Sequence, residues 1–280
     1  MRQVLWSATL RRDVPLKDRI SVAAEAGYAA VSLFHQDFTE LGCDRPAARA
    51  ISAYAADCGV ALSIMDGSTV WYPVDETRPL RSPPVSFETA MDAAEAFGCT
   101  KISAVPGFAT KLDVAGLAER FAVACDAARD RGLQVQLEFT PVPPVKGLAA
   151  GWEIVRMADR PNGSLVFDTW HFYRSDPDFA LLETIPGRLI TGVQISDGAA
   201  EIKESVIKDT FLHRLIPGDG VFDLPQVIEI LRRNEGLNDV GPEVLSREVH
   251  ALSSAEAATL TRRAVERLVE GSAPSAGEAP

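Results

Sequence analysis

The sequence predicts a single-domain α/β protein that folds as a (β/α)8 barrel, the TIM barrel. Short apolar runs alternate along the chain with longer segments whose apolar residues recur at helical spacing. Several runs are apolar without a break, as in parallel strands that are covered on both faces. No linker divides the 280 residues, and such barrels reach about 250 residues as one domain. We therefore expect the barrel to span residues 1–270.

The strands are predicted at eight apolar runs. In chain order they are Gln3–Ala8, Ala29–Phe34, Ala61–Met65, Lys101–Pro106, Gln134–Phe139, Leu165–Asp168, Leu189–Ser196 and Val240–Leu245. An open, doubly wound sheet is the alternative arrangement. Eight strands, with polar residues distributed over their ends, favour the closed barrel.

The helices are predicted between the strands and after the last one. They are Leu16–Ala26, Ala47–Cys58, Phe87–Phe97, Ala115–Arg131, a short one at Asp178–Thr184, Leu224–Asn234 and Ala255–Val269. Glycines just past four periodic segments indicate helix ends, at Gly27, Gly98, Gly132 and Gly236.

Two long loops are predicted after strands, at Asp66–Pro84 and Gly198–Val221. Long loops in compact domains are often functional, and we expect the first to cover a pocket mouth. The small, polar tail Gly271–Pro280 is expected to be disordered.

Composition excludes several classes of function. The net charge of -11 opposes binding to nucleic acid or to an anionic membrane surface, which require clustered Lys and Arg. No apolar run reaches the roughly 20 residues of a membrane span, and the start lacks the features of a signal peptide. The four cysteines show no CxxC spacing. We expect a cytoplasmic protein with free thiols and no cysteine-bound zinc.

Four apolar runs in the second half of the chain end in residues that can bind a hard metal ion. These residues are Glu138, Asp168, Gln194 and Glu243. The carboxyl ends of parallel barrel strands meet at one end of the barrel, where such folds place their chemistry. Carboxylate and amide oxygens suit Mg²⁺ or Mn²⁺. The alternative is that these side chains cap backbone amides at the barrel end.

Other residues near the same end are candidates for substrate binding. His35 and Asp66 end the second and third strands, and Trp71 lies in the loop that follows the third strand. For each of these, packing or loop capping is the alternative. Trp6 is expected to fill the core, and Glu248 to lie at the surface.

The ordered motifs LEFTP, FDTWHFYRS, VQISD, RLIPGDGVFDL and GPEVLS resemble the xylose-isomerase-like TIM-barrel superfamily of sugar isomerases, epimerases and related lyases. The resemblance implies one divalent ion, Mn²⁺ or Mg²⁺ with Co²⁺ or Zn²⁺ as alternatives, held by Glu138, Asp168, Gln194 and Glu243. It also implies that Glu138 and Glu243 exchange a proton with the substrate carbon.

The resemblance implies roles for two further residues. His171 matches a position that contacts a substrate oxygen, and it could also carry a proton. Arg214 matches a substrate-binding arginine. Glutamine at Gln194, where many members have histidine, is similar to the hydroxypyruvate isomerase and dehydroshikimate dehydratase branches. Family members commonly form dimers or tetramers, so a homo-oligomer is compatible with the resemblance.

The leading interpretation is an isomerase or epimerase that acts on a small keto sugar or hydroxy-carbonyl acid. A cation on the carbonyl oxygen stabilises the enediolate that forms when the neighbouring carbon loses a proton. The nearest alternative is a lyase of the 3-dehydroshikimate dehydratase type. A non-catalytic sugar-binding subunit is a third. An endonuclease IV-like enzyme needs a histidine-rich zinc cluster, and this chain has only 4 histidines.

Overall fold

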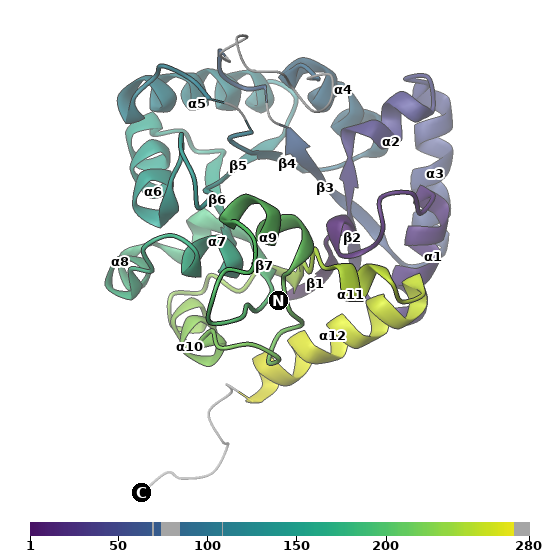
Figure 1. Cartoon of the computed structure of the whole chain (residues 1–280). Helices are drawn as coiled ribbons and strands as arrows, with labels where there is room; N and C mark the ends of the chain where they lie inside the picture. Colours follow the sequence, from purple (N-terminus) through teal and green to yellow (C-terminus); the bar gives the residue numbers. More distant parts are fainter. Residues whose placement is uncertain (69, 74–84, 108, 272–280) are drawn as a thin grey trace, which may run out of the picture.

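The computed structural model describes residues 1–68, 70–73, 85–107 and 109–271. Its strands form a closed barrel in sequence order, with every neighbouring pair parallel (Figure 1). The strands are β1 (Arg2–Leu5), β2 (Ala30–Phe34), β3 (Ala61–Ser68), β4 (Lys101–Ala104), β5 (Gln134–Glu138), β6 (Gly163–Asp168), β7 (Ile190–Ile195) and β8 (Asp239–Pro242). The predicted TIM barrel and all eight predicted strands are confirmed. The predicted loop Asp66–Pro84 begins later than expected, because β3 runs on through Asp66 to Ser68. Residues 69 and 74–84 of this predicted loop lie outside the described residues.

Helices surround the barrel (Figure 1). They are α1 (Leu16–Ala26), α2 (His35–Glu40), α3 (Arg45–Asp57), α4 (Phe87–Phe97), α5 (Val114–Arg129), α6 (Gly147–Ala158), α7 (Thr169–Tyr173), α8 (Phe179–Thr184), α9 (Val206–Leu212), α10 (Leu224–Arg233), α11 (Arg247–His250) and α12 (Ser254–Gly271), with 3-10 turns η1 (Ser7–Thr9) and η2 (Gly187–Leu189). α1 and α4 have the predicted bounds and end at left-handed Gly27 and Gly98. Gly271 belongs to α12, and the rest of the predicted tail lies outside the described residues.

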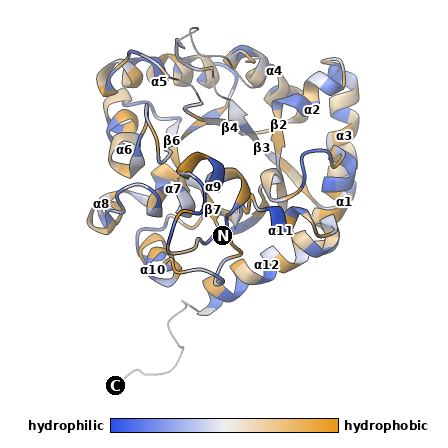
Figure 2. Cartoon of the chain, viewed as in Figure 1, coloured by the Kyte–Doolittle hydropathy of each residue, from blue (hydrophilic) through white to orange (hydrophobic). Residues whose placement is uncertain are grey.

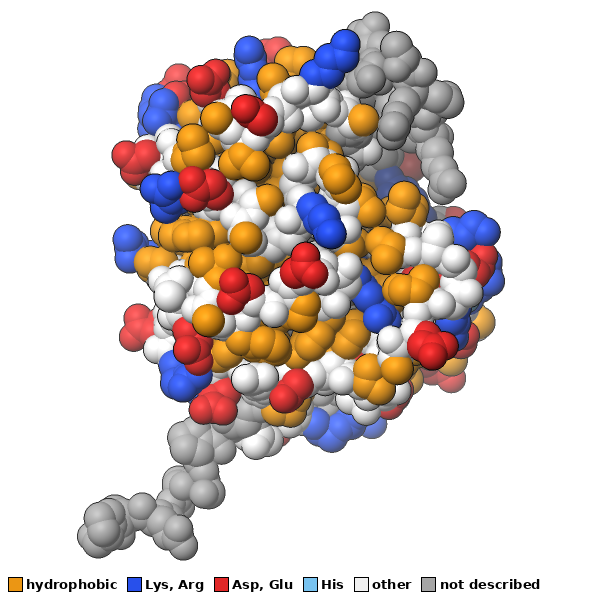
Figure 3. Space-filling view, turned by 60° about the vertical axis from the view of Figure 1, so that its left-hand side comes forward, with side chains coloured by type: hydrophobic (Ala, Val, Ile, Leu, Met, Phe, Trp, Pro, Cys, Tyr) orange, Lys and Arg blue, Asp and Glu red, His pale blue; other side chains and the backbone are white. Residues whose placement is uncertain are grey.

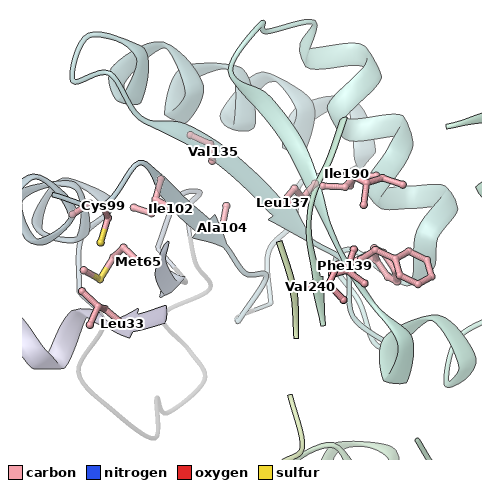
Figure 4. Close-up of a cluster of buried hydrophobic side chains, with 14 of the residues drawn as sticks. Leu33, Met65, Cys99, Ile102, Ala104, Val135, Leu137, Phe139, Ile190 and Val240 are labelled. Carbon is pink, nitrogen blue, oxygen red and sulfur yellow. The ribbon is translucent and has the colours of Figure 1, made fainter. Parts of the chain in front are cut away.

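The main core lies between the barrel wall and the helices. Figure 4 shows part of it, where outward-facing side chains such as Leu33, Met65, Ile102 and Leu137 come from successive strands. The helices turn apolar faces inward and polar faces outward (Figure 2). On the side that carries α5, α6 and α8, acidic and basic side chains are interspersed (Figure 3). Burial of apolar surface is the main driving force of folding. The apolar layer between the barrel wall and the helices therefore fixes the barrel and its strand ends.

A second, smaller apolar cluster fills the barrel interior. It consists of Val4, Trp6, Ala30, Ile64 and Val166. Trp6 is fully buried there, as predicted. Gly192 leaves room for the indole ring of Trp6, because a Cβ there would lie 3.2 Å from the ring. Gly241 lets two strands approach closely, because a Cβ there would lie 1.7 Å from the carbonyl oxygen of Val4.

The register of the strands brings the predicted ligands to one end of the barrel. Asp168 pairs with Gln194, and Gln194 pairs with Gly241, two residues before Glu243. Glu138 pairs with Val166, two residues before Asp168. At the opposite end, Asp239 receives hydrogen bonds from Arg2 and Lys101. The apolar cluster around Trp6 thus separates the barrel end that carries the predicted ligands from the end that carries Asp239.

All four cysteines are free, as predicted. Within the described ranges, no helix is both long enough and apolar enough to span a membrane.

Candidate metal centre

The four predicted ligands lie together and are almost fully buried, with exposed fractions between 0% and 6%. The amide nitrogen Nε2 of Gln194 donates to Oε1 of Glu243 at 2.9 Å. Nη1 of Arg214 donates to Oδ2 of Asp168 at 2.8 Å and to Oε2 of Glu243 at 3.2 Å. The structure therefore joins the ends of β6, β7 and β8 through one hydrogen-bonded group of side chains.

His171 is positioned by the short helix that follows β6. Asp168 caps this helix, because its Oδ1 accepts from the backbone amides of Trp170 and His171. The imidazole Nε2 then lies 3.1 Å from Oε1 of Glu138 and 3.4 Å from Oδ2 of Asp168. Ligand atoms of Glu138, Asp168 and His171 all lie within 4.8 Å of one another, close enough to share one ion. His171 is thus a potential metal ligand, and its predicted contact with a substrate oxygen stays a prediction.

Burial sets the electrostatics of the centre. It raises the pKa of Glu243 well above the usual value, and the carboxylates of Glu138, Asp168 and Asp66 raise it further against the effect of Arg214. Burial alone would also raise the pKa of Asp168, but Arg214 and His171 outweigh it and hold that pKa below its usual value. The carboxylates are therefore crowded, and a bound cation would relieve their repulsion.

Arg214 belongs to the centre itself. Its side chain is 2% exposed, and its Nε donates to the backbone carbonyl of Thr210 on α9. Burial would lower its pKa, but Asp168 and Glu243 raise it above the usual value, so the guanidinium is a fixed positive charge. The prediction that Arg214 contacts substrate stays a prediction. The side chain does not face solvent, because the ion pairs with Asp168 and Glu243 draw it inside.

The three other predicted substrate contacts have different surroundings. Asp66 is 5% exposed at the end of β3, and burial followed by the charge of Glu138 raises its pKa to about 7. His35 is half-buried at the first position of α2, and burial lowers its pKa. Trp71 is buried; its Nε1 donates to the carbonyl of Val105, and its ring packs on Phe121 of α5. These contacts hold Trp71 within the fold, and its role in substrate binding stays a prediction.

The donor set fits a hard divalent ion. Oε1 of Gln194 is buried and has no hydrogen-bond partner among the described residues. A buried amide oxygen without a partner is costly unless something else binds it. Together with the neighbouring carboxylates and the imidazole, it gives the oxygen-rich coordination that Mg²⁺ and Mn²⁺ prefer and that Zn²⁺ accepts. The residues present therefore fit the metal that the sequence predicted.

Asp197 fixes the loop that follows β7. Oδ1 of Asp197 accepts from the amides of Gly198 and Phe222, and Oδ2 accepts from the amide of Gly218. Asp197 thereby closes the loop that carries Arg214. Glu248 is exposed on α11, as predicted, and accepts from the Ser246 hydroxyl.

Most of the sequence matches one protein family. A model of the "Xylose isomerase-like TIM barrel" family matches residues 20–269. The chain belongs to this family. The resemblance predicted from the five motifs is therefore confirmed.

Curated relatives carry two kinds of name. An inosose isomerase of Bacillus velezensis is 26% identical over 192 residues, which cover 65% of this chain and 67% of the relative. A 3-dehydroshikimate dehydratase of Pseudomonas aeruginosa is 34% identical over 113 residues, which cover 40% of this chain but only 17% of the relative. The chain thus spans about two thirds of the isomerase and a small part of the dehydratase.

Solved structures share the fold. The IolI protein with a bound zinc atom superposes with a TM-score of 0.83 at 20% identity, covering 97% of this chain and 99% of that one. A D-psicose 3-epimerase in the presence of D-fructose superposes with a TM-score of 0.73 at 16% identity, covering 97% and 100%. At these identities the likeness establishes the fold alone.

Proposed function

We propose that this protein is a divalent-metal-dependent isomerase or epimerase that moves a proton next to the carbonyl of a small polyhydroxy ketone. The observation that carries the proposal is the buried group of Glu138, Asp168, Gln194 and Glu243, in which the amide oxygen of Gln194 has no partner among the described residues. The similarity to inosose isomerases supports an enzyme of this type.

Glu138, Asp168, Gln194 and Glu243 would hold the ion, with His171 near enough to join them. When bound, the ion would polarise the carbonyl of the substrate and so make the neighbouring C–H bond more acidic. The proton transfers would be carried out by side chains of the protein itself.

Glu138 and Glu243 are the proposed proton-transfer pair. β6 and β7 lie between their strands in the barrel wall, so the two carboxylates approach a substrate from different directions. One can take a proton from a carbon while the other returns a proton, which gives an epimer or an isomer according to the position of return. His171, hydrogen-bonded to Glu138, can hold a substrate oxygen or pass a proton to it. Arg214 keeps Glu243 in place and offers positive charge to substrate oxygens.

A lyase is the second candidate, because the dehydratase relative is 34% identical over its matched segment. The same proton abstraction followed by loss of a β-hydroxyl would give elimination in place of isomerisation. Polyhydroxy ketones of the inosose or ketohexose type are favoured here, since the inosose isomerases match a larger share of the chain.

The test is incubation of the metal-loaded protein in D₂O with an inosose, D-fructose, hydroxypyruvate and 3-dehydroshikimate. We expect deuterium at a carbon next to the carbonyl of a polyhydroxy ketone, without loss of water, and no exchange after chelation of the metal. Glu243→Gln should lower the rate by about 10²–10⁴-fold, the usual contribution of a positioned acid or base. The exposed Glu248→Gln is the matched control and should keep the wild-type rate.

Two outcomes would contradict the proposal. Wild-type exchange in Glu243→Gln would remove that carboxylate from the reaction. Loss of water from 3-dehydroshikimate, seen as a new ultraviolet absorption, would favour the lyase if no ketone exchanges deuterium.

A further inference from the structure

Two buried threonine hydroxyls brace the backbone beside the candidate ligands. The first is Thr9, on η1 after β1, with 0% exposure. Its hydroxyl donates to the carbonyl of Pro242 at 2.8 Å and accepts from the amide of Val244 at 3.2 Å. These two backbone groups lie on either side of Glu243, so a single side chain fixes both peptide units that flank this residue.

Thr169, directly after Asp168, makes a similar pair of bonds to Ser196, the residue that follows β7. Its hydroxyl donates to the carbonyl of Ser196 at 2.7 Å and accepts from the amide of the same residue at 2.9 Å. Ser196 lies two residues after Gln194, and Thr169 is also 0% exposed. Thr169 therefore ties the ligand on β6 to the ligand on β7.

In both places the hydroxyl continues a strand pairing beyond its last backbone pair. The pairing of β1 with β8 ends at Gln3 and Val240, and that of β6 with β7 ends at Asp168 and Gln194. Glu243 is held further by its own amide, which donates to the carbonyl of Ile195 at 3.0 Å. Its carbonyl accepts from Arg214 at 3.2 Å. The ligand backbone is thus fixed from several directions, although it lies past the ends of the regular strands.

We propose that Thr9 and Thr169 are positioning residues of the metal centre, which hold Glu243, Asp168 and Gln194 in the geometry that binds the ion. This inference rests on the proposed function, because it concerns the same centre. Ligand atoms need placement to within about 0.5 Å. Outer groups that orient ligands typically contribute 10–100-fold to metal affinity. Replacing either hydroxyl with a methyl group leaves a backbone carbonyl and an amide without a partner and frees the strand end to shift.

The experiment measures the affinity of the purified full chain for Mn²⁺ and for Zn²⁺ by titration calorimetry. Thr9→Val and Thr169→Val remove the hydroxyl with little change of shape, whereas Thr9→Ser and Thr169→Ser retain it. The matched control is Thr261→Val on α12. Thr261 is also 0% exposed, and its hydroxyl donates to the carbonyl of Ala257 at 2.7 Å, away from the centre.

We expect both valine variants to bind metal about 10–100-fold more weakly. Both serine variants and Thr261→Val should stay within about twofold of the wild type, even where Thr261→Val is less stable. Excess metal should restore the activity of the valine variants, a rescue that general destabilisation would not give. If one valine variant fails to fold, the other still decides, because each threonine braces a different strand.

Wild-type metal affinity in the folded valine variants would overturn the inference. Equal weakening in Thr261→Val would overturn it too, because the effect would then follow from stability. If the wild-type protein itself binds neither ion, the proposed function fails first, and this outcome is distinct from a selective loss in the threonine variants.

Discussion

Arg214 lies in an environment unlike that of an ordinary, exposed loop arginine. Its Nη1 lies between Oδ2 of Asp168 and Oε2 of Glu243, and its Nε is bound to the carbonyl of Thr210. Transfer of a guanidinium into a protein interior is costly unless carboxylates and acceptors surround it. Here they do, so Arg214 offsets part of the negative charge of the centre and also orients Glu243.

Arg214→Ala should therefore destabilise the metal-free protein by about 3–5 kcal/mol, because it leaves buried carboxylates without their partner. Urea unfolding in the presence of a chelator measures this change. Arg233→Ala is the control, since Arg233 forms an exposed ion pair with Glu183, and such pairs contribute about 0–1 kcal/mol. Similar unfolding free energies for the two variants would show that the buried ion pairs do not stabilise the fold.

Sequence patterns predicted most, but not all, of the helices and strands. Periodicity predicted all eight strands and both bounds of α1 and α4, because apolar spacing reports the buried face directly. It missed α6, which begins at Gly147 after a proline-rich stretch and has no side-chain cap at Lys146. It also placed His35 at the end of a strand, whereas the residue begins α2, where Asp37 accepts from the amide of Phe34.

The details of the site were less accessible from the sequence, because they join distant segments. The candidate ligands could be predicted, since each ends an apolar run. The hydrogen bond between Thr9 and Val244 could not be predicted, because the two residues are 235 positions apart in the sequence. The ion pair of Arg214 with Asp168 likewise spans 46 positions and depends on the path of the intervening loop. Such contacts follow from barrel closure and leave no local pattern.

The loop after β7 provides a prediction at the level of an element. Asp197→Ala should open this loop, because the amides of Gly198, Gly218 and Phe222 lose their acceptor, and Gly198 and Phe222 are buried. At a buried amide, each such loss costs about 1–3 kcal/mol. Hydrogen exchange should rise sharply in peptides that cover residues 213–223. Asp223→Ala, which removes only the exposed cap of α10, is the control and should change exchange mainly in α10. Unchanged protection in Asp197→Ala would show that other contacts hold the loop.

For the whole molecule, charge is distributed unequally between the two ends of the barrel. At one end, Asp239 is paired with Arg2 and Lys101. At the other, four buried acids, Asp66, Glu138, Asp168 and Glu243, lie near one another, and Arg214 is paired with two of them, Asp168 and Glu243. The apolar cluster around Trp6 lies between the ends. Without a cation, deprotonation of Asp66 or Glu243 is unfavourable, because burial and the neighbouring carboxylates raise the pKa of both.

This imbalance predicts the dependence of stability on pH. The pKa of Asp66 is raised from 3.8 to about 7 in the folded protein, by burial and then by Glu138. Between these two values the folded state holds a proton that the unfolded state has released, so the free energy of unfolding falls as the pH rises. Asp66→Asn keeps the uncharged form at every pH. Its stability advantage over the wild type, both metal-free, should grow by about 2–3 kcal/mol from pH 5 to pH 8.

Urea unfolding of both proteins at the two pH values measures this difference, and Asp176→Asn gives the effect of the same chemical change at an exposed position. Saturating Mn²⁺ should reduce the advantage at pH 8, because the cation offsets the charge of Asp66 and its neighbours. An advantage that stays constant with pH would mean that Asp66 is ionised at little cost in the folded protein. The imbalance between the two ends would then be smaller than the burial of these acids implies.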